Sequence, residues 1–234
     1  NHETLATTDF LAEMYNAKVP VPQGFVVTAQ AYAYFFSKTG LDKQVSYALN
    51  GIDVNNTAQL ENASKTIRAL IEKTKMPSDL EDEIIEAYQI LDSGQTERAT
   101  SLLKKGRGVF VAVRSSATTE DLADASFAGQ QDSYLNVRGE KELIESVRKC
   151  VSSLFTARAI YYRQKKGFAH DKAKLAVVVQ VMVNSEKSGV MFSRNPTKEE
   201  DTIVIEAVWG LGEGIVSGKI KPDHYVVDGN LESF

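Results

Sequence analysis

The segment VFVAVRSSATTEDLADASFAGQQDSYLNV, residues 109–137, is the part of the chain from which the fold is most readily inferred. It begins as a short apolar strand that leads into Arg114, Ser115 and Ser116, and an apolar pattern resumes only at Tyr134. The residues between are mostly polar or small. We therefore expect a strand that delivers an arginine and two hydroxyl groups into a long loop, followed by a second apolar element.

The side chains of this loop suit a phosphate group. Phosphate oxygens are bound by a fixed cation, by hydroxyl groups and by backbone N–H groups, and glycine permits a close backbone approach. Arg114 supplies the cation, while Gly129 and Ser133 supply the loop. The same residues also fit a surface loop in which Arg114 pairs with Glu120 or Asp121. The residues alone leave both interpretations open.

Composition narrows the class of protein. A chain of 234 residues with 43% hydrophobic content can bury a large core, as one domain or as two lobes. The 31 acidic and 27 basic residues give no electrostatic reason to expect nucleic acid or a membrane as a partner. Apolar runs such as 175–183 are too short to span a bilayer, and the N-terminus lacks a signal-peptide pattern. We expect a cytoplasmic protein, with its single cysteine, Cys150, in the core.

Helices dominate the expected first half of the chain. A strand is predicted at 24–28, and its last residue, a threonine, caps a helix that reaches Phe36. Apolar residues at helical spacing predict further helices around 60–71 and 84–91, with Gly94 after the end of the second.

The second half is expected to contain one long helix and then a sheet. Apolar residues at steps of three and four predict a helix over 140–166 that stops at Gly167. Short β-branched runs separated by turn residues predict strands at 175–183, 188–193, 202–209 and 224–227. The fold class is therefore α+β, with a helical N-terminal part followed by a mixed or antiparallel sheet.

Three polar positions in the second half are candidate site residues. Gln180 interrupts an apolar strand, and its flat amide suits the edge of a purine as well as a bond to neighbouring backbone. Arg194 follows a strand, a position at which both binding-site residues and ordinary charged loop residues occur. Glu206 precedes a glycine-rich loop and is compatible with a ribose or metal contact, or with an exposed surface position.

The glycine-rich segment GLGEGIVSG, residues 210–218, does not fit the standard nucleotide motifs. Ile215 stands where a dinucleotide fingerprint needs its last glycine, and Ile220 stands where a P-loop needs a hydroxyl after the lysine. The histidines are also scattered without ligand spacing, so we expect no His/Cys metal site.

Five motifs together resemble a known family. They are VPVPQGFVVT (19–28), VAVRSSATTEDLADASFAGQQDSYLNV (111–137), VVVQVMV (177–183), GVMFSRNP (189–196) and EAVWGLGEGIVSGKIKPDHYVV (206–227). In this order they resemble the N-terminal nucleotide-binding domain of the phosphoenolpyruvate synthase and pyruvate phosphate dikinase family, which also includes rifampin phosphotransferase. The SSATTEDLADASFAGQQ segment resembles the synthases and the rifampin enzymes more than the dikinases, and the KPDHY segment favours the synthases.

The resemblance implies an ATP-grasp fold in which residues 1–234 form an ATP-binding domain with lobes 1–180 and 181–234, the second incomplete. It assigns Arg114 to the phosphates as a catalytic and binding residue, Gly129 and Ser133 to the phosphate loop, and Gln180 to the adenine side. Arg194 and Glu206 are further expected nucleotide contacts.

The resemblance also implies an activity. In the family, the β-phosphoryl of ATP passes to a histidine on a separate domain and then to pyruvate, which gives phosphoenolpyruvate, AMP and phosphate. The implied cofactors are ATP and Mg²⁺, with metal ligands expected beyond residue 234. The implied partners are the phosphohistidine and pyruvate-binding domains of the full-length protein.

Two departures from the family pattern lead to alternatives. The chain opens with NHETLATTDF, which has threonine where the family has a phosphate-binding lysine, and it stops at Phe234. We therefore expect a fragment that is not competent for full turnover. The alternatives are the ATP domain of a rifampin-type phosphotransferase, and a noncatalytic nucleotide-binding or interaction module.

Overall fold

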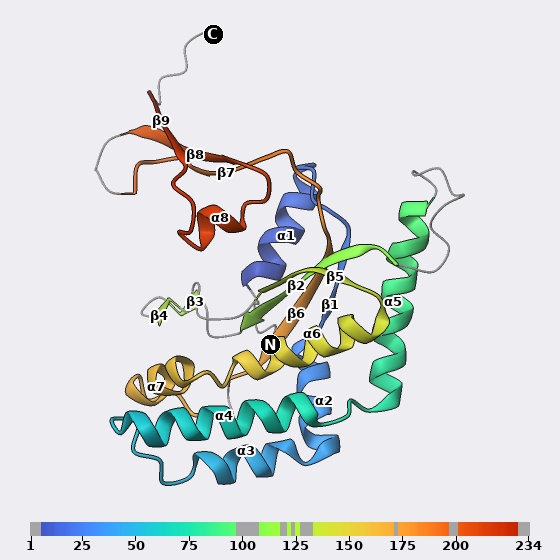
Figure 1. The fold of residues 1–234 in the computed structure, drawn as a ribbon, viewed down its shortest axis with the longest axis vertical. Coiled ribbons are helices and arrows are strands. Elements are labelled where there is room, and N and C mark those ends of the chain that lie inside the picture. The colour runs from blue at the N-terminus through green and yellow to red at the C-terminus, as the bar shows by residue number, and fades with distance from the viewer. Residues whose placement is uncertain are drawn as a thin grey trace. The chain divides into compact units, whose positions relative to one another are not determined.

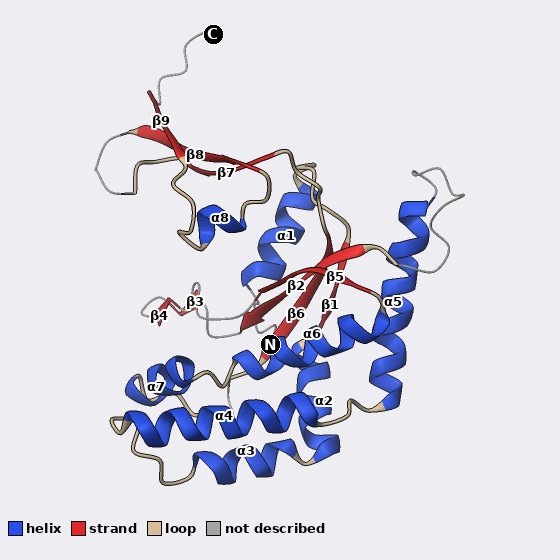
Figure 2. Ribbon diagram, in the orientation of Figure 1, coloured by secondary structure: helices blue, strands red, loops and turns tan. Residues whose placement is uncertain are grey.

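The computed structural model describes residues 6–96, 108–117, 121–122, 125–126, 133–170, 173–196 and 201–228. The chain divides into two compact units, Asn1–Met182 and Val183–Phe234. Figure 1 follows the chain through both units, and Figure 2 separates helices from strands. In the part of the chain described, no helix is both long enough and apolar enough to cross a membrane.

The first unit combines helices with an antiparallel sheet. The sheet has the order β1-β6-β2-β5, and each neighbouring pair is antiparallel. Its strands are β1 Gly24–Val27, β2 Phe110–Ala117, β5 Ser133–Arg138 and β6 Leu175–Val181, and a separate pair is β3 Asp121–Leu122 with β4 Ala125–Ser126. The helices are α1 Ala6–Asn16, α2 Ala29–Thr39, α3 Leu41–Leu49, α4 Thr57–Lys73, α5 Ser78–Thr96, α6 Glu140–Ser153 and α7 Ala157–Lys165. The predicted combination of helices with antiparallel sheet is confirmed.

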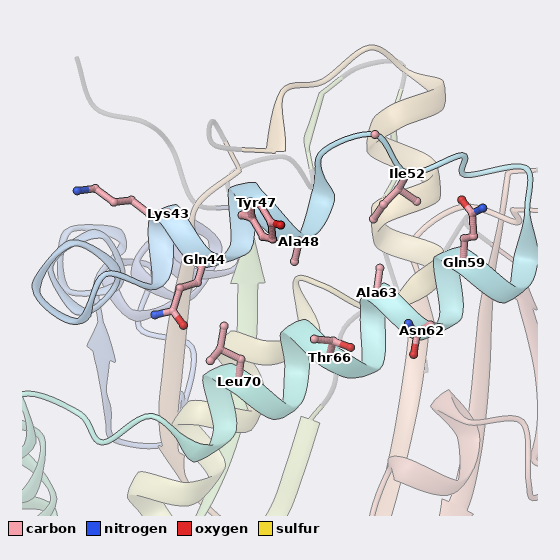
Figure 3. A pocket seen from close by; sticks show the side chains of 11 residues that line it. Lys43, Gln44, Tyr47, Ala48, Ile52, Gln59, Asn62, Ala63, Thr66 and Leu70 are labelled. Atoms are coloured by element: carbon pink, nitrogen blue, oxygen red, sulfur yellow. The ribbon is translucent and has the colours of Figure 1, made fainter.

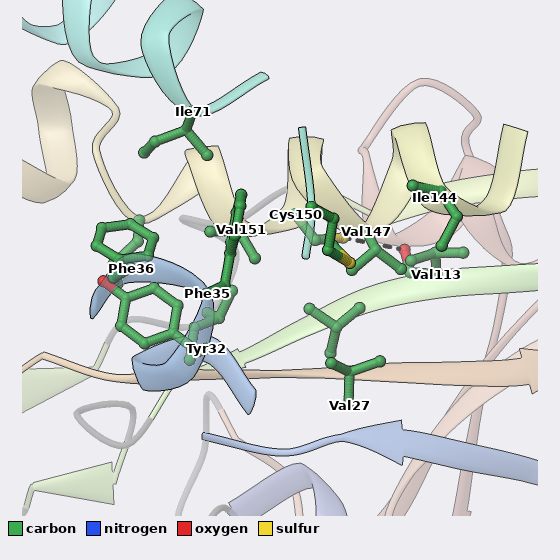
Figure 4. Close-up of a cluster of buried hydrophobic side chains, with 14 of the residues drawn as sticks. Val27, Tyr32, Phe35, Phe36, Ile71, Val113, Ile144, Val147, Cys150 and Val151 are labelled. Carbon is green, nitrogen blue, oxygen red and sulfur yellow. Dashed lines mark hydrogen bonds between the residues drawn. The ribbon is translucent and has the colours of Figure 1, made fainter. Parts of the chain in front are cut away.

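One face of this sheet is the base of the main core. Val113 of β2 and Val177 and Val179 of β6 point to this side and are at most 1% exposed. Helices α2 and α6 pack on it, and Figure 4 shows α6 residues above Val113 and Val27. Cys150 of α6 is fully buried in this cluster, as predicted. We call this side the core face.

The predicted single helix over 140–166 is wrong, because the chain forms two helices, α6 and α7, with a break at 154–156. The break has its own hydrogen bonds: Thr156 Oγ1 accepts from the N–H of Ala159 at 3.3 Å and caps α7. Buried Ser64 Oγ donates to the Phe155 carbonyl at 2.8 Å. The apolar spacing runs through the break because both helices bury the same side of the chain. The threonine cap is the signal that reveals the break.

Other helix boundaries are partly as predicted. Thr28 caps α2 by accepting from the N–H of Ala31 at 3.2 Å, which confirms the expected start. Gly94 was expected after the end of its helix and instead lies within α5, which continues to Thr96. Gly167 follows the end of α7 with a positive φ of 71°, as a helix-stop glycine does.

A β-bulge interrupts the pairing of β2 with β5. Val111 lies opposite Val137, but Val113 lies opposite Tyr134, so β5 contains one more residue than β2 between the two pairs. Asn136, inside this interval, has a left-handed φ of 58°. Such an extra residue is the defining feature of a bulge, and asparagine tolerates this backbone conformation better than most residues.

The second unit contains a three-stranded antiparallel sheet. Its order is β7-β8-β9, formed by Lys187–Phe192, Thr202–Trp209 and Asp223–Asp228. The short helix α8, Glu213–Val216, follows β8 and packs against it. Val204 and Val208, on one face of β8, are its most buried residues.

Candidate functional site

Three predicted residues of the first unit lie on the same face of its sheet. Arg114 pairs with Ser133 of β5 on one side and with Val178 of β6 on the other. Gln180 lies two residues beyond Val178. Because opposite residues on neighbouring strands, and alternate residues along one strand, share a face, Arg114, Ser133 and Gln180 point to the same side. We call this side the Arg114 face, and it is opposite the core face.

The register also sets the spacing of these side chains. Directly opposite residues, such as Arg114 and Ser133, have Cβ atoms roughly 4.5–5.5 Å apart, and diagonal neighbours such as Arg114 and Gln180 are roughly 7–8 Å apart. The side chain of Arg114 is exposed. The face therefore presents an accessible cation beside a hydroxyl, with an amide one step further across the sheet.

The prediction that Arg114 and the two serines after it enter a loop is wrong. They lie within β2, which continues to Ala117. The strand continues because β6 pairs with β2 as far as Leu175 opposite Ala117. The polar residue types suggested a loop, because the sequence alone does not show the neighbouring strand. Whether a residue joins a sheet depends on that strand as much as on the residue type. Strand geometry fixes the direction of Arg114 more firmly than a loop would.

Ser116 is a residue of this face that the sequence did not single out as a site residue. It lies two positions after Arg114, is completely buried, and its Oγ has no hydrogen-bond partner among the described residues. Buried hydroxyls nearly always have a partner. Its position beside Arg114 was readable from the two-residue alternation of a strand, but its burial was not.

Gln180 is held by backbone in the way that one of its two interpretations predicted. Its Nε2 donates to the carbonyl oxygen of Pro22 at 3.2 Å, and the side chain is 8% exposed. No described residue donates a hydrogen bond to its Oε1. Gly24 lies opposite Gln180, and a Cβ at Gly24 would come within 2.5 Å of the Val179 carbonyl oxygen. The glycine thus allows β1 to approach the residues around this amide.

A cavity of about 490 Å³ lies next to Gln180. Gln180 and Val178 line it from the sheet, and Leu11 and Tyr15 line it from α1. Because Val178 lies directly opposite Arg114, the cavity and the cation are adjacent on one face. The cavity is mostly apolar and falls in the size range of small-molecule sites, about 300–1,000 Å³.

The remaining predicted residues do not join this group in the structure. Gly129 lies outside the described residues. Arg194 and Glu206 belong to the second unit, where Arg194 follows β7 and Glu206 lies in the middle of β8. Glu206 Oε1 is 3.6 Å from Nδ1 of His224 on β9, directly opposite.

Two other observations bear on the chemistry of the described residues. They contain no group of three or more His, Cys, Asp and Glu side chains that could hold a metal ion. A groove of about 890 Å³ between α3 and α4 is lined by neutral side chains apart from Lys43 and contains none of the predicted site residues (Figure 3). The Arg114 face is therefore the place where three of the predicted residues, Arg114, Ser133 and Gln180, meet.

A face with an exposed arginine, a hydroxyl, and an amide beside an apolar cavity has the groups that bind a phosphorylated planar ligand. In agreement, the profile of a family described as "Pyruvate phosphate dikinase, AMP/ATP-binding domain" matches residues 8–234. The chain belongs to this family, and the resemblance seen in its five motifs is confirmed.

Several curated relatives carry the name phosphoenolpyruvate synthase. The chain is 55% identical to a probable phosphoenolpyruvate synthase of Methanocaldococcus jannaschii, and 93% of this chain aligns with 18% of that protein. It is 54% identical to a probable phosphoenolpyruvate synthase of Archaeoglobus fulgidus, with 93% of this chain and 28% of the relative aligned. It is 43% identical to the phosphoenolpyruvate synthase of Pyrococcus furiosus, with 93% and 30% aligned. The chain thus spans less than a third of the length of these relatives.

Proposed function

We propose that this chain binds ATP on the Arg114 face of its first sheet. The observation that carries the proposal is the strand register, because it brings Arg114, Ser133 and Gln180 to one side of the sheet. Membership of a family of AMP/ATP-binding domains supports ATP as the ligand. We also propose that the fold is of the ATP-grasp type, which the antiparallel sheets and the family support.

Arg114 is assigned to the phosphates of ATP. A planar guanidinium forms paired, charge-assisted hydrogen bonds with phosphate oxygens, and Ser133 adds a hydroxyl directly opposite. Gly129 is assigned to the same loop as the position of closest backbone approach. Phosphoryl transfer depends on positioning and charge neutralisation, so Arg114 serves catalysis as well as binding.

Gln180 is assigned to the adenine base. Its Nε2 donates to Pro22, which fixes the orientation of the amide, and its Oε1 is proposed to accept a hydrogen bond from the base. An acceptor at this position suits the amino group of adenine. The apolar cavity between α1 and β6 would then hold the ring.

Arg194 and Glu206 are further proposed nucleotide contacts, and they belong to the second unit. The ATP site on the Arg114 face does not depend on them. Mg²⁺ would neutralise phosphate charge during transfer. Since the described residues contain no suitable cluster of ligands, we assign none of them to the metal.

For the whole protein we propose phosphoenolpyruvate synthase activity, the activity named for its relatives. The β-phosphoryl of ATP would pass to a histidine of a separate domain and from there to pyruvate, with release of AMP and phosphate. The names of these relatives favour the synthase over the rifampin-type phosphotransferase. The 234-residue chain alone is expected to form no phosphoenolpyruvate.

Calorimetric titration with ATP and Mg²⁺ tests the binding site. We expect saturable binding by the chain, and a loss of roughly tenfold to a hundredfold in affinity in Arg114→Ala, because a charged hydrogen-bonding partner is removed. The matched control is Arg158→Ala, an exposed arginine of α7 away from the Arg114 face. Equal affinity in both variants would disprove the assignment of Arg114.

Phosphorus NMR of the full-length protein with pyruvate and ATP tests the reaction. Formation of phosphoenolpyruvate, AMP and phosphate supports the synthase. Formation of phosphoenolpyruvate by the 234-residue chain alone would contradict the requirement for separate acceptor domains.

A further inference from the structure

A second large cavity lies on the opposite side of the first unit from the Arg114 face. It has a volume of about 940 Å³ and is bordered by α2, α3 and residues of the segment from Phe155 to Lys174. Helix α2 packs on the core face of the sheet, so the sheet separates this cavity from the Arg114 face. Its size is that of a ligand site, and none of the proposed ATP contacts lines it.

The cavity has an aromatic wall. The rings of Tyr32 and Phe36 have centroids 4.3 Å apart, and Phe36 stacks on Phe155 with centroids 6.1 Å apart and an interplanar angle of 20°. Tyr32 and Phe36 lie side by side on α2 in Figure 4. A wall of this kind favours a flat apolar or aromatic group.

Tyr32 adds a hydroxyl to this wall that has no hydrogen-bond partner among the described residues. The side chain is 9% exposed and lines the cavity. Buried tyrosine hydroxyls usually find a partner. The Tyr32 hydroxyl is therefore a donor, inside an apolar surrounding, available to a bound molecule.

A buried positive charge lies behind the same wall. Arg163 of α7 is fully buried, its Nε donates to Nδ1 of His170 at 3.1 Å, and its Nη2 donates to the Leu154 carbonyl at 2.6 Å. Its guanidinium lies 5.6 Å from the centre of the Phe155 ring, and its Nη1 has no partner. Within the part of the chain that the structure describes, no carboxylate forms an ion pair with Arg163.

The positive charge of Arg163 acts on Tyr32 in the cavity wall. Burial lowers the pKa of Arg163 to about 10, which reflects the cost of holding a charge away from water, and neighbouring Tyr32 offsets part of that shift. Burial raises the pKa of Tyr32, and the charge of Arg163 opposes this rise, so the two groups interact electrostatically. An anion at the Tyr32 hydroxyl would experience the same attraction, strengthened by the low dielectric of the site.

The other charged groups around the cavity are mainly basic. Lys43 and Lys174 line it, with Asp42 as the carboxylate of the lining. Asp42 already accepts a hydrogen bond from the backbone N–H of Lys43 at 2.8 Å. Lys43 extends away from α4 in Figure 3. His170 accepts from Arg163 through Nδ1, so its proton is on Nε2, which faces Gln164 Oε1 at 3.1 Å.

We propose that this cavity is a binding site for a small organic anion with an aromatic ring, separate from the ATP site. The ring packs against Phe36 and Phe155, and the anionic group accepts a hydrogen bond from the Tyr32 hydroxyl near Lys174. The buried guanidinium of Arg163 supplies the compensating positive charge.

Titration calorimetry of the 234-residue chain with three related probes tests this site. The probes are 1-naphthoate, 1-naphthyl phosphate and the neutral 1-naphthalenemethanol. We expect saturable binding of at least one anion, at least about tenfold tighter than the alcohol, because a charged group gains more from the site than a neutral one. The stronger of the two anions identifies a carboxylate or a phosphate as the preferred group. Equal binding of all three probes would refute an anion site.

Variants locate the anion. Tyr32→Phe removes only the hydroxyl and is expected to weaken binding about fivefold, and Lys174→Ala and Arg163→Met about tenfold each. Lys141→Ala, an exposed lysine of α6 outside the cavity, is the control and should leave affinity unchanged. If Arg163→Met does not fold, Tyr32→Phe and Lys174→Ala decide alone. Unchanged affinity in both, or displacement of the probe by ATP, would overturn the proposal.

Discussion

The two sheets of this chain differ in how much of their apolar surface is covered. In β6 of the first unit, every residue from Leu175 to Gln180 is buried, whereas no residue of β7 in the second unit is buried. On one face of the second sheet, Trp209, Met191 and Tyr225 are 74%, 66% and 52% exposed. Similar strand-forming residues thus make different contributions to stability, because stability depends on what packs against the strand.

The largest expected effect comes from removing methyl groups in the covered sheet. Val177→Ala in β6 should lower the free energy of unfolding by about 2–3 kcal/mol, since a fully buried valine loses apolar contacts and leaves a cavity. Val226→Ala in β9, where the side chain is 55% exposed, is the matched control with an effect below about 0.5 kcal/mol. Urea unfolding followed by circular dichroism measures the first, and hydrogen exchange the second. Equal losses would show that coverage does not distinguish the sheets.

Two glycines, one in each sheet, extend the comparison to the backbone. Gly24→Ala should cost about 2 kcal/mol, because the new Cβ would lie 2.5 Å from the Val179 carbonyl oxygen unless β1 and β6 separate. Gly189→Ala places a Cβ 2.8 Å from the Glu206 carbonyl oxygen and should loosen only β7 against β8. Hydrogen exchange resolved by segment should show faster exchange in β6 for the first variant and in β8 for the second. Faster exchange in both strands in either variant would contradict this.

A smaller effect is expected at the start of β2. Tyr88 Oη donates to the Val109 carbonyl at 2.6 Å and accepts from the N–H of Gly139 at 2.9 Å, so it joins α5 to the ends of β2 and β5. Tyr88→Phe removes both bonds and should cost about 1.5 kcal/mol in urea unfolding. Tyr47→Phe, at a residue 84% exposed, should cost nothing measurable. A Tyr88→Phe variant as stable as the parent would mean that packing alone holds this junction.

The smallest effect is expected at the exposed pair of the second unit. Glu206→Gln should change stability by less than about 0.5 kcal/mol, because the contact with His224 is solvent-accessible and is charged only when the histidine is protonated. Thermal unfolding at low and high salt measures it. A loss above about 1 kcal/mol would contradict the expectation that this solvent-accessible contact contributes little.

The sequence predicts strands and caps well where one residue determines them. Thr28 alone predicts the start of α2, and the short β-branched run before Gln180 predicts β6. It fails where tertiary contacts decide the outcome. The break between α6 and α7 has a local signal in the Thr156 cap, but the apolar spacing does not show it, and the contact of Ser64 with Phe155, 91 residues away, belongs to no local pattern. Gly94 lies within α5 and does not end it. A single glycine costs a helix only about 1 kcal/mol relative to alanine, so it need not stop one.

In the candidate site too, some features follow from the local sequence and others only from tertiary contacts. Gln180 was recognisable as a polar residue in an apolar strand and Arg114 as a polar residue after one, but their common face follows from a register that only the pairing of β2 with β6 defines. The burial of Ser116 and the bond from Gln180 to Pro22, across 158 residues, also depend on the folded chain. The roles of Arg114, Gly129, Ser133, Gln180, Arg194 and Glu206 stay predictions that binding experiments must test.

The bulge in β5 has a consequence for how this site can change during evolution. With regular pairing continued from Val111 and Val137, Tyr134 would lie opposite Arg114, and the extra residue around Asn136 places Ser133 there instead. A shift of register that straightens the bulge without loss of a residue would therefore exchange a small hydroxyl for a bulky phenol beside the arginine, whereas deletion of the extra residue would keep Ser133 opposite Arg114. The side chain beside Arg114 is thus set by the backbone conformation around Asn136, and not only by the residue types of β5.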